Sequence, residues 1–322
     1  MRRIFHILFK ALLSILKLPR LFCQLCEATF YLSKMANHPN CEYFVCPYGI
    51  GDTLFLASLM KEYKKYHHVK KVCFIVKPNH RDLPRMFSAI DETIVSDRQV
   101  KILQIFAISL RRFRFGNLRY GHFILKFGWP EPGLMMGVNG ASLMDVYRRP
   151  VLNLPFDAQP EIPKVSLDAS EMVEWDKSLG IVKHLVVLMP NAVTVERLDS
   201  VVFEQLADEL IRRGYRVYTN VLNENEPPVK NTQQMILPLK EFYYLSQAYH
   251  WSCIALRSGI CDMLAFTNVK TIVLHGSEIA YRVWNMKNLR LPNQNMLDIL
   301  LEGEVPYSKS LEEILSYFPS VV

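Results

Sequence analysis

The strongest constraint in this sequence is an alternation of short apolar runs with helical stretches, which occurs twice along the chain. In the first half, the expected strands are 43–46, 72–76, 93–95 and 123–125, with helices around 54–66 and 100–112. In the second half, the expected strands are 185–189, 217–220, 235–237, 253–256 and 271–274, with helices over 203–213, 239–249 and 261–266. Strands that alternate with helices form a parallel sheet covered on both faces, so the sequence predicts an α/β fold.

A Pro-rich stretch separates the two halves. Pro150, Pro155, Pro160 and Pro163 occur where the periodicity is lost, which is typical of a linker. We therefore predict an N-terminal segment (1–40), a first Rossmann-like domain (41–150), a linker (151–165) and a second Rossmann-like domain (166–322) that ends in a helix. Two doubly wound domains of this kind leave a cleft between them, where ligands bind at the carboxyl ends of the strands.

The first 34 residues carry much of the chain's positive charge. The formal net charge is +7, and this segment holds six basic residues against Glu27 alone. On a helix, its basic residues fall on one side and its Phe, Leu and Ile residues on the other. The apolar run is too short to cross a membrane. We therefore expect a basic amphipathic helix on an anionic membrane surface.

This expectation places the protein in the cytoplasm, peripheral on the inner face of the cytoplasmic membrane. Two alternatives remain: the helix packs on the body of the protein, or it is a signal peptide, for which no small-residue cleavage pattern follows. The rest of the chain is nearly neutral, which argues against a nucleic-acid partner.

The seven cysteines are an odd number in a long chain, which favours a reducing compartment over a disulfide framework. Cys23 and Cys26 have the spacing of half a zinc site, and Cys41 and Cys46 follow. Because these four belong to helical and strand-like runs that would not converge, we expect no metal and take them as small core residues.

Three loops that follow expected strands carry candidate site residues. The first contains Gly49, Gly51 and Asp52. Its glycines permit a tight turn and close approach of a ligand to the backbone, and Asp52 begins a helix that faces the cleft. The loop lacks the Lys-Ser/Thr of a P-loop and the third glycine of a dinucleotide fingerprint. Asp52 is also explained as a helix cap.

The second loop offers Thr194 and Arg197, a hydroxyl and a cation that suit a phosphate. The third loop combines Arg257, Ser258 and Gly259 with Asp262. A guanidinium, a hydroxyl and helix N-terminal amides are the components of an anion site. Glu224, just past the strand 217–220, is a candidate for the ribose hydroxyls of a nucleotide.

Two further segments of the first half are candidates for the acceptor side. Trp129 lies in a loop after an expected strand. A run of arginines is interleaved with aromatic residues, namely Arg111, Arg112, Arg114, Arg119, Phe113, Phe115 and Tyr120. This run suits an anionic, partly apolar acceptor, and it is equally explained as an exposed basic helix end.

Three stretches, 49–67, 190–218 and 237–276, resemble the ADP-heptose:lipopolysaccharide heptosyltransferase family. They read GIGDTLFLASLMKEYKKYH, PNAVTVERLDSVVFEQLADELIRRGYRVY and LPLKEFYYLSQAYHWSCIALRSGICDMLAFTNVKTIVLHG. The resemblance covers most of residues 42–280. It implies a two-domain GT-B fold, inverting glycosyl transfer and a nucleotide-sugar donor held mainly by the second domain. It also implies that Asp52 is the catalytic base, since Asp52 lies on the matching position of the family.

The third loop departs from the family's pattern. Where the family usually has Asp-Ser-Gly-Pro-x-His, this chain has Arg257-Ser258-Gly259-Ile260-Cys261-Asp262. A cation therefore replaces the acidic residue that faces the donor sugar, and the version here resembles members of bacterial capsule and polysaccharide gene sets.

An inverting transfer needs a base for the acceptor hydroxyl and positive charge for the departing diphosphate. Asp52 suits the first task, and the second and third loops suit the other. No Asp-x-Asp motif occurs in the chain, which favours a mechanism without a metal cofactor. We expect a nucleoside diphosphate sugar as co-substrate and a lipid-linked or phosphorylated glycan as acceptor. The alternative is a non-catalytic domain of this fold that acts as a binding or assembly partner in polysaccharide biosynthesis.

Overall fold

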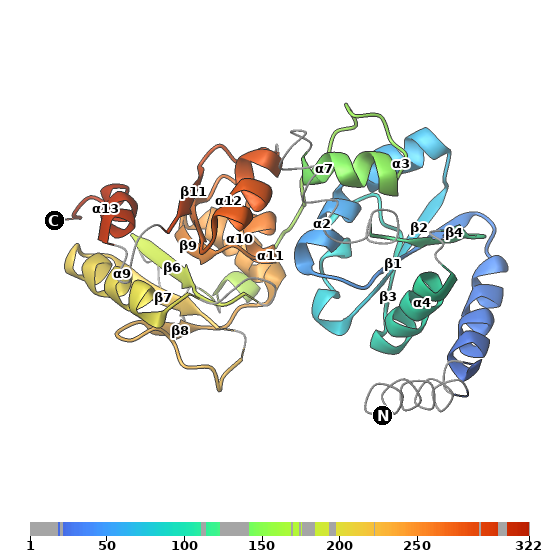
Figure 1. Ribbon diagram of the computed structural model, residues 1–322, viewed down its shortest axis with the longest axis horizontal. Helices are drawn as coiled ribbons and strands as arrows, with labels where there is room; N and C mark the ends of the chain where they lie inside the picture. Colours follow the sequence, from blue (N-terminus) through green and yellow to red (C-terminus); the bar gives the residue numbers. More distant parts are fainter. Residues whose placement is uncertain are drawn as a thin grey trace, which may run out of the picture.

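The computed structural model describes residues 19, 22–110, 114–122, 142–168, 170–173, 175, 184–192, 198–221, 223–289, 291–301 and 308–321. Two α/β lobes lie side by side (Figure 1), each built on a mainly parallel sheet. We call them the N-lobe, which contains strands β1–β5, and the C-lobe, which contains strands β6–β11. The α/β prediction is therefore confirmed.

The N-lobe sheet has the strand order β3-β2-β1-β5-β4, and only β4 pairs antiparallel. Its strands are β1 (Cys41–Cys46), β2 (Lys71–Val76), β3 (Glu92–Val95), β4 (Arg114–Phe115) and β5 (Leu118–Tyr120). Its helices are α2 (Ile50–Ser58), α3 (Met60–His67), α4 (Asp97–Leu110) and α7 (Leu143–Val146), with short helical turns η1 (Pro78–His80), η2 (Pro84–Met86) and η3 (Tyr147–Val151). β1 and β2 are almost wholly buried, as expected for inner strands covered on both faces.

The C-lobe sheet has the order β11-β10-β9-β6-β7-β8 and is parallel throughout. Its strands are β6 (Leu185–Met189), β7 (Arg216–Asn220), β8 (Gln233–Met235), β9 (Ser252–Leu256), β10 (Lys270–His275) and β11 (Met296–Leu300). Its helices are α9 (Ser200–Arg212), α10 (Leu239–Ala248), α11 (Gly259–Leu264), α12 (Glu278–Trp284) and α13 (Ser308–Ser316), with the turn η4 (Met286–Leu289). In chain order, this is the 3-2-1-4-5-6 arrangement of dinucleotide-binding sheets.

Most of the strands that the structure describes were predicted from the sequence, and three, β4, β5 and β11, were not. The strand expected at 123–125 lies outside the described residues, whereas β4 and β5 form a short hairpin before it. β11 was not predicted because its central residue is Asp298, which interrupts the apolar run. The single helix expected over 54–66 is two helices, α2 and α3, that meet at Leu59.

The lobes share a buried core. One apolar cluster contains Phe55 of α2 together with Leu264 and Phe266 of the C-lobe, and the rings of Phe55 and Phe266 lie 6.4 Å apart. Residues 152–168 form neither helix nor strand. Within them, the Glu161 N–H donates to the Ser58 carbonyl at 2.7 Å. The predicted linker therefore packs along the N-lobe.

A helix over residues 22–36 lies at the edge of the N-lobe beside α4, drawn in dark blue in Figure 1. Ala28 and Met35 are buried on its inner side, and Glu27 pairs with Arg98 of α4 at 2.6 Å. The prediction of core cysteines is right for Cys41 and Cys46 and wrong for Cys23 and Cys26, which are exposed. Ala28 and Met35, and neither cysteine, supply the buried side of this helix.

In the part of the chain that the structure describes, no helix combines the length and apolar character needed to cross a bilayer.

Candidate active site

In the N-lobe sheet, β2 and β3 lie on one side of β1 and β5 lies on the other, so the topological switch point of the sheet is between β1 and β5. Two polar side chains lie together at this switch point. Asp52 lies in the first turn of α2, just after β1. His122 lies just after the end of β5. His122 Nε2 lies 3.5 Å from Asp52 Oδ1. Such switch points are where open α/β sheets bind ligands.

Asp52 is held by three groups. The Gly49 N–H donates to Oδ2 at 3.0 Å, so Asp52 does cap α2. The Tyr147 hydroxyl donates to Oδ1 at 2.6 Å, and His122 is the third neighbour. Burial alone would raise the pKa of Asp52, but His122, Tyr147 and the Gly49 N–H outweigh it, and the pKa lies below its ordinary value. About a quarter of the side chain is exposed, at 27%. Asp52 is thus an ionised carboxylate open to solvent on one side.

The sequence missed the two side chains that hold Asp52. The ring of His122 lies 3.9 Å from that of Tyr48, and His122 is 5% exposed. A signal for it existed, because a strand placed at 118–120 would have put His122 at a strand end. Tyr147 had no such signal, since it lies in no helix or strand that the sequence predicted.

In the C-lobe sheet, β7 and β8 lie on one side of β6 and β9 to β11 lie on the other, so the topological switch point is between β6 and β9. Two of the predicted donor loops follow these strands, so the structure brings them to one edge of the sheet. Of the second loop, the described part ends at Ala192, and Thr194 and Arg197 lie outside the described residues. Trp129 also lies outside them. The third loop, with Arg257, Ser258, Gly259 and Asp262, is described completely.

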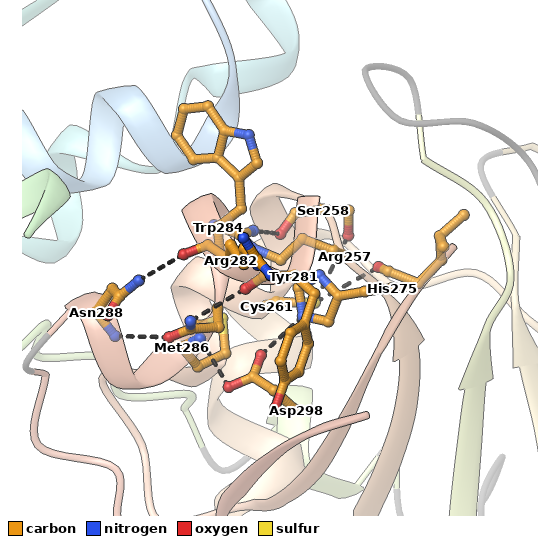
Figure 2. A network of polar contacts seen from close by, with 12 residues as sticks. Arg257, Ser258, Cys261, His275, Tyr281, Arg282, Trp284, Met286, Asn288 and Asp298 are labelled. Carbon is orange, nitrogen blue, oxygen red and sulfur yellow. Dashed lines mark hydrogen bonds and ion pairs between the residues drawn. The ribbon is translucent and has the colours of Figure 1, made fainter. Parts of the chain in front are cut away.

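Arg257 is buried, and its guanidinium donates hydrogen bonds to groups of the protein itself. Its Nη2 donates to Asp262 Oδ1 at 2.6 Å, its Nη1 to the Ser258 carbonyl at 2.7 Å and its Nε to the Trp284 carbonyl at 2.8 Å. Figure 2 shows this guanidinium within a network that reaches the end of α12. Arg257 therefore holds its own loop and α12 together in this structure. Contact of Arg257 with a donor phosphate stays a prediction.

Asp262 differs from Asp52 in its surroundings. Burial raises the pKa of Asp262 to about 6, Asp52 across the lobe contact acts in the same direction, and Arg257 offsets part of the effect. Only 5% of the residue is exposed.

The helices that follow the two switch points, α2 and α11, are in contact. A Cβ atom on Gly51 would lie 2.0 Å from Asp262 Oδ2, and one on Gly259 would lie 3.0 Å from the Ile50 Cβ. A side chain at position 51 would therefore displace Asp262 where α2 packs against α11, and these two helices lie next to each other near the centre of Figure 1. Asp52 and the Arg257 loop consequently lie close together, where the lobes meet.

The predicted ribose ligand, Glu224, is exposed, and its backbone carbonyl accepts from Gln234 Nε2 at 3.3 Å. Glu226, two residues later, was not predicted. Its carboxylate accepts from Asn191 Nδ2 at 2.5 Å, and Asn191 directly follows Pro190 at the end of β6. The Glu226 carboxylate thus contacts a residue at the end of β6, beside the C-lobe switch point.

Arg119, one of the arginines considered for the acceptor side, is paired with Glu42 at 2.7 Å and is largely buried. Arg114 is exposed, and 111–113 lie outside the described residues. Across the described ranges, no three His, Cys, Asp or Glu side chains are grouped so as to hold a metal ion.

Comparisons with known proteins give the same fold. No protein-family model and no curated protein matches the sequence. Among solved structures, the chain is similar to ADP-heptose lipopolysaccharide heptosyltransferase II of E. coli, with a TM-score of 0.57, 15% identity, and 86% of this chain and 97% of that chain covered. It is also similar to a glycosyl transferase family 9 protein of Veillonella parvula, with a TM-score of 0.55, 13% identity, and coverage of 88% and 93%. The chain therefore has the two-lobed GT-B fold of these transferases.

Proposed function

We propose that the protein is an inverting, metal-independent glycosyltransferase. It moves a sugar from a nucleoside diphosphate sugar to a lipid-linked or surface glycan of the lipopolysaccharide or capsule type. The observation that carries this proposal is the meeting of the two switch points, where the partly exposed carboxylate of Asp52 lies against the Asp262 loop. The similarity to the E. coli ADP-heptose lipopolysaccharide heptosyltransferase II supports a nucleotide-sugar donor.

Asp52 takes the proton of the acceptor hydroxyl. The acceptor oxygen then attacks the anomeric carbon from the face opposite the diphosphate, the bond from that carbon to the phosphate oxygen breaks, and the nucleoside diphosphate leaves as an anion. The proton remains on Asp52 until it is lost to solvent. A positioned base of this kind contributes about 10²–10⁴-fold to a rate.

The donor lies at the C-lobe switch point. Thr194, Arg197, Ser258 and the Gly259 amide bind the diphosphate, while Arg257 and Asp262 support their loop. Protein cations and amides neutralise the leaving group, so chelation with EDTA leaves transfer unchanged, and activity lost on chelation and restored by a divalent ion contradicts the metal-independent mechanism.

Glu226 binds the ribose hydroxyls. An acidic residue after the second strand has this role in dinucleotide-binding sheets, and the bond from Asn191 orients the Glu226 carboxylate. The test is a panel of nucleoside diphosphates read by thermal shift. Glu226→Gln weakens the ligand's stabilisation, whereas Glu224→Gln, the matched control on the same loop, leaves it unchanged. Equal responses would refute the role of Glu226.

The acceptor lies at the N-lobe edge. Gly49, which is exposed, lets it approach the backbone beside Asp52, and Trp129 contributes to its pocket. Gly51, predicted for the same side, is buried against Asp262 instead, so it packs the lobes together and leaves no room for a ligand. Part of such an acceptor is apolar, so the enzyme works at the cytoplasmic face of the membrane.

The helix 22–36 supports the membrane proposal. Phe22 and Phe30 are 68% and 53% exposed on its outer side, and Lys34 Nζ lies 4.4 Å from the ring of Phe30. These residues continue the basic, apolar sequence of 1–18. The variant Phe22→Asp/Phe30→Asp loses sedimentation with vesicles rich in anionic lipid, because apolar contact and charge attraction both decrease. Ile279→Asp, at an equally exposed apolar position of α12, is the control, and equal sedimentation of both variants would contradict the membrane face.

The function itself is tested by transfer. Purified protein is incubated with a panel of nucleotide sugars and lipid-linked or lipopolysaccharide acceptors, and products are read by mass spectrometry, with the anomeric configuration read by NMR. Glycosylated acceptor with inverted configuration supports the proposal. Retention of configuration contradicts the inverting mechanism.

A second candidate is a non-catalytic binding or assembly partner of the same fold. One observation favours it: Arg257, which replaces the acidic residue of the resembling family, is buried and internally paired. This candidate predicts nucleotide-sugar binding without turnover of any donor, with wild type and Asp52→Asn giving the same null result.

A further inference from the structure

Tyr147 connects the junction between the lobes to the Asp52 carboxylate. Its side chain is fully buried, and its hydroxyl donates to Asp52 Oδ1 at 2.6 Å. Burial and the neighbouring carboxylate raise the pKa of Tyr147 well above its ordinary value, so the hydroxyl stays protonated and remains a donor. A hydrogen bond from a buried donor to an ionised acceptor is among the stronger ones in proteins.

The segment that carries Tyr147 is fixed on both sides. Ser142 and Asp145 form a capping box at the start of α7. Arg148, the next residue after Tyr147, donates to Asp145 Oδ1 at 3.0 Å and to the Ala158 carbonyl at 2.7 Å, and Ala158 belongs to the linker. α7 also lies against η4 of the C-lobe. The position of Tyr147 therefore depends on the linker and on the other lobe.

Ring packing sets the direction of the hydroxyl. The ring of Tyr147 lies 6.0 Å from that of Phe55, which in turn lies 6.4 Å from that of Phe266 in the C-lobe. Its opposite neighbour is His122, which meets it edge-on at 6.5 Å. This row of rings runs from the C-lobe to the Asp52 site, and its packing aims the Tyr147 hydroxyl at Oδ1.

We propose that Tyr147 is a positioning residue for Asp52, which fixes the rotation of the carboxylate and so couples it to the packing of the lobes. The inference rests on the proposed function. Each carboxylate oxygen has two lone pairs. Among the described residues, Tyr147 and His122 approach Oδ1, whereas Oδ2 accepts the Gly49 N–H alone. Oδ2 therefore keeps the lone pair that takes the acceptor proton.

The inference also has a consequence for pH. The titratable groups around Asp52 come from several elements: Cys46 of β1, His80 of η1, His122 after β5, Tyr147 of η3 and Asp262 of α11. Of these, Tyr147 is a neutral donor whose bond favours the charged form of Asp52. Loss of this bond raises the pKa of Asp52, so the acid limb of the rate profile moves to higher pH.

The test compares Tyr147→Phe with Tyr63→Phe. Tyr63 is a matched control, because it too is buried and donates its hydroxyl to a carboxylate, that of Glu42, which takes no part in the site. Tyr147→Phe lowers kcat by about tenfold or more, leaves the acceptor KM within about twofold, and moves the acid limb of kcat/KM to higher pH. Tyr63→Phe changes neither kcat nor the profile. Identical profiles for the two variants would overturn the proposal.

A second measurement does not depend on activity. The carboxyl ¹³C resonance of Asp52, assigned by its loss in Asp52→Asn, is titrated in the full-length wild type and in both Tyr variants. The pKa of Asp52 rises in Tyr147→Phe and stays at the wild-type value in Tyr63→Phe. An unchanged pKa in Tyr147→Phe refutes the positioning role even if transfer is observed. Absence of transfer by the wild type, together with a raised pKa in Tyr147→Phe, refutes the proposed function and not this contact.

Discussion

Asp52 and Asp262 occupy similar places in the two lobes and have opposite environments. Each lies in the first turn of a helix that follows a strand at a switch point. Asp52 is partly exposed and its donors lower its pKa, whereas Asp262 is buried and its pKa is raised to about 6. Environment, and not residue type, separates their roles. Asp52 is open to solvent on one side, and Asp262 packs against Gly51 between the lobes.

The loops around these aspartates differ in the same way. In the N-lobe loop, Gly49 and Tyr147 direct their donors at Asp52 and leave one side of it open. In the C-lobe loop, Arg257 uses its guanidinium to satisfy Asp262 and two backbone carbonyls. A charged loop at a strand end is therefore not by itself an anion site, because its charged side chains can pair with other groups of the protein.

The largest effect on stability is expected from Arg257→Met. The substitution leaves the buried Asp262 carboxylate without its partner, which costs about 3–5 kcal/mol of unfolding free energy. Urea unfolding measures this cost. The double variant Arg257→Met/Asp262→Leu removes both charges and recovers most of the loss. If Arg257→Met unfolds at the wild-type urea midpoint, the pairing of Arg257 with Asp262 does not stabilise the fold.

Gly51→Ala is expected to cost somewhat less, about 2–3 kcal/mol, because its new methyl group would overlap Asp262 Oδ2 and force α2 away from α11. Gly49→Ala is the matched control from the same loop. A Cβ there would meet Asp52 Oδ2 at 3.5 Å, an ordinary contact. Thermal unfolding of the two variants compares them, and equal melting temperatures would show that the lobes do not touch at Gly51.

The smallest effect is a pH dependence of stability with opposite signs for the two aspartates. Asp262 has a folded-state pKa above its unfolded value near 3.9, so its favourable contribution is complete at low pH and is lost as pH rises toward 6, by about 2 kcal/mol. Asp52 has a lowered pKa, so its contribution is present above pH 4 and is lost as pH falls.

Urea midpoints measured from pH 7 down to below pH 4 separate these contributions, since the Asp52 contribution changes mainly below its unfolded pKa. Relative to wild type, Asp262→Asn becomes less destabilised as pH rises, and Asp52→Asn becomes more destabilised. Parallel pH curves for the two variants would contradict the contrast between the two environments.

The sequence predicted the parts of the site that depend on local pattern. An apolar strand followed by Gly49, Gly51 and Asp52 locates the N-lobe switch point, since strand and turn signals are local. Tyr147 was missed because its bond to Asp52 spans 95 residues and it lies in no predicted helix or strand.

The C-lobe loop was located correctly, and its internal pairing was not foreseen. The Trp284 carbonyl that binds Arg257 comes from a separate element, so only the tertiary structure brings them together. Glu224 was predicted and Glu226 was not, because a polar loop gives no sign of which carboxylate pairs with Asn191 beside β6. The positions of these loops were therefore predictable from local pattern, and the tertiary partners of their side chains were not.

The most direct test of the account is the transfer rate of Asp52→Asn beside that of the wild type, with donor affinity measured on the same samples. Asparagine keeps the shape of Asp52 and removes its basicity. The account predicts a loss of about 10²–10⁴-fold in kcat with donor affinity unchanged. Equal transfer by the two proteins would contradict it.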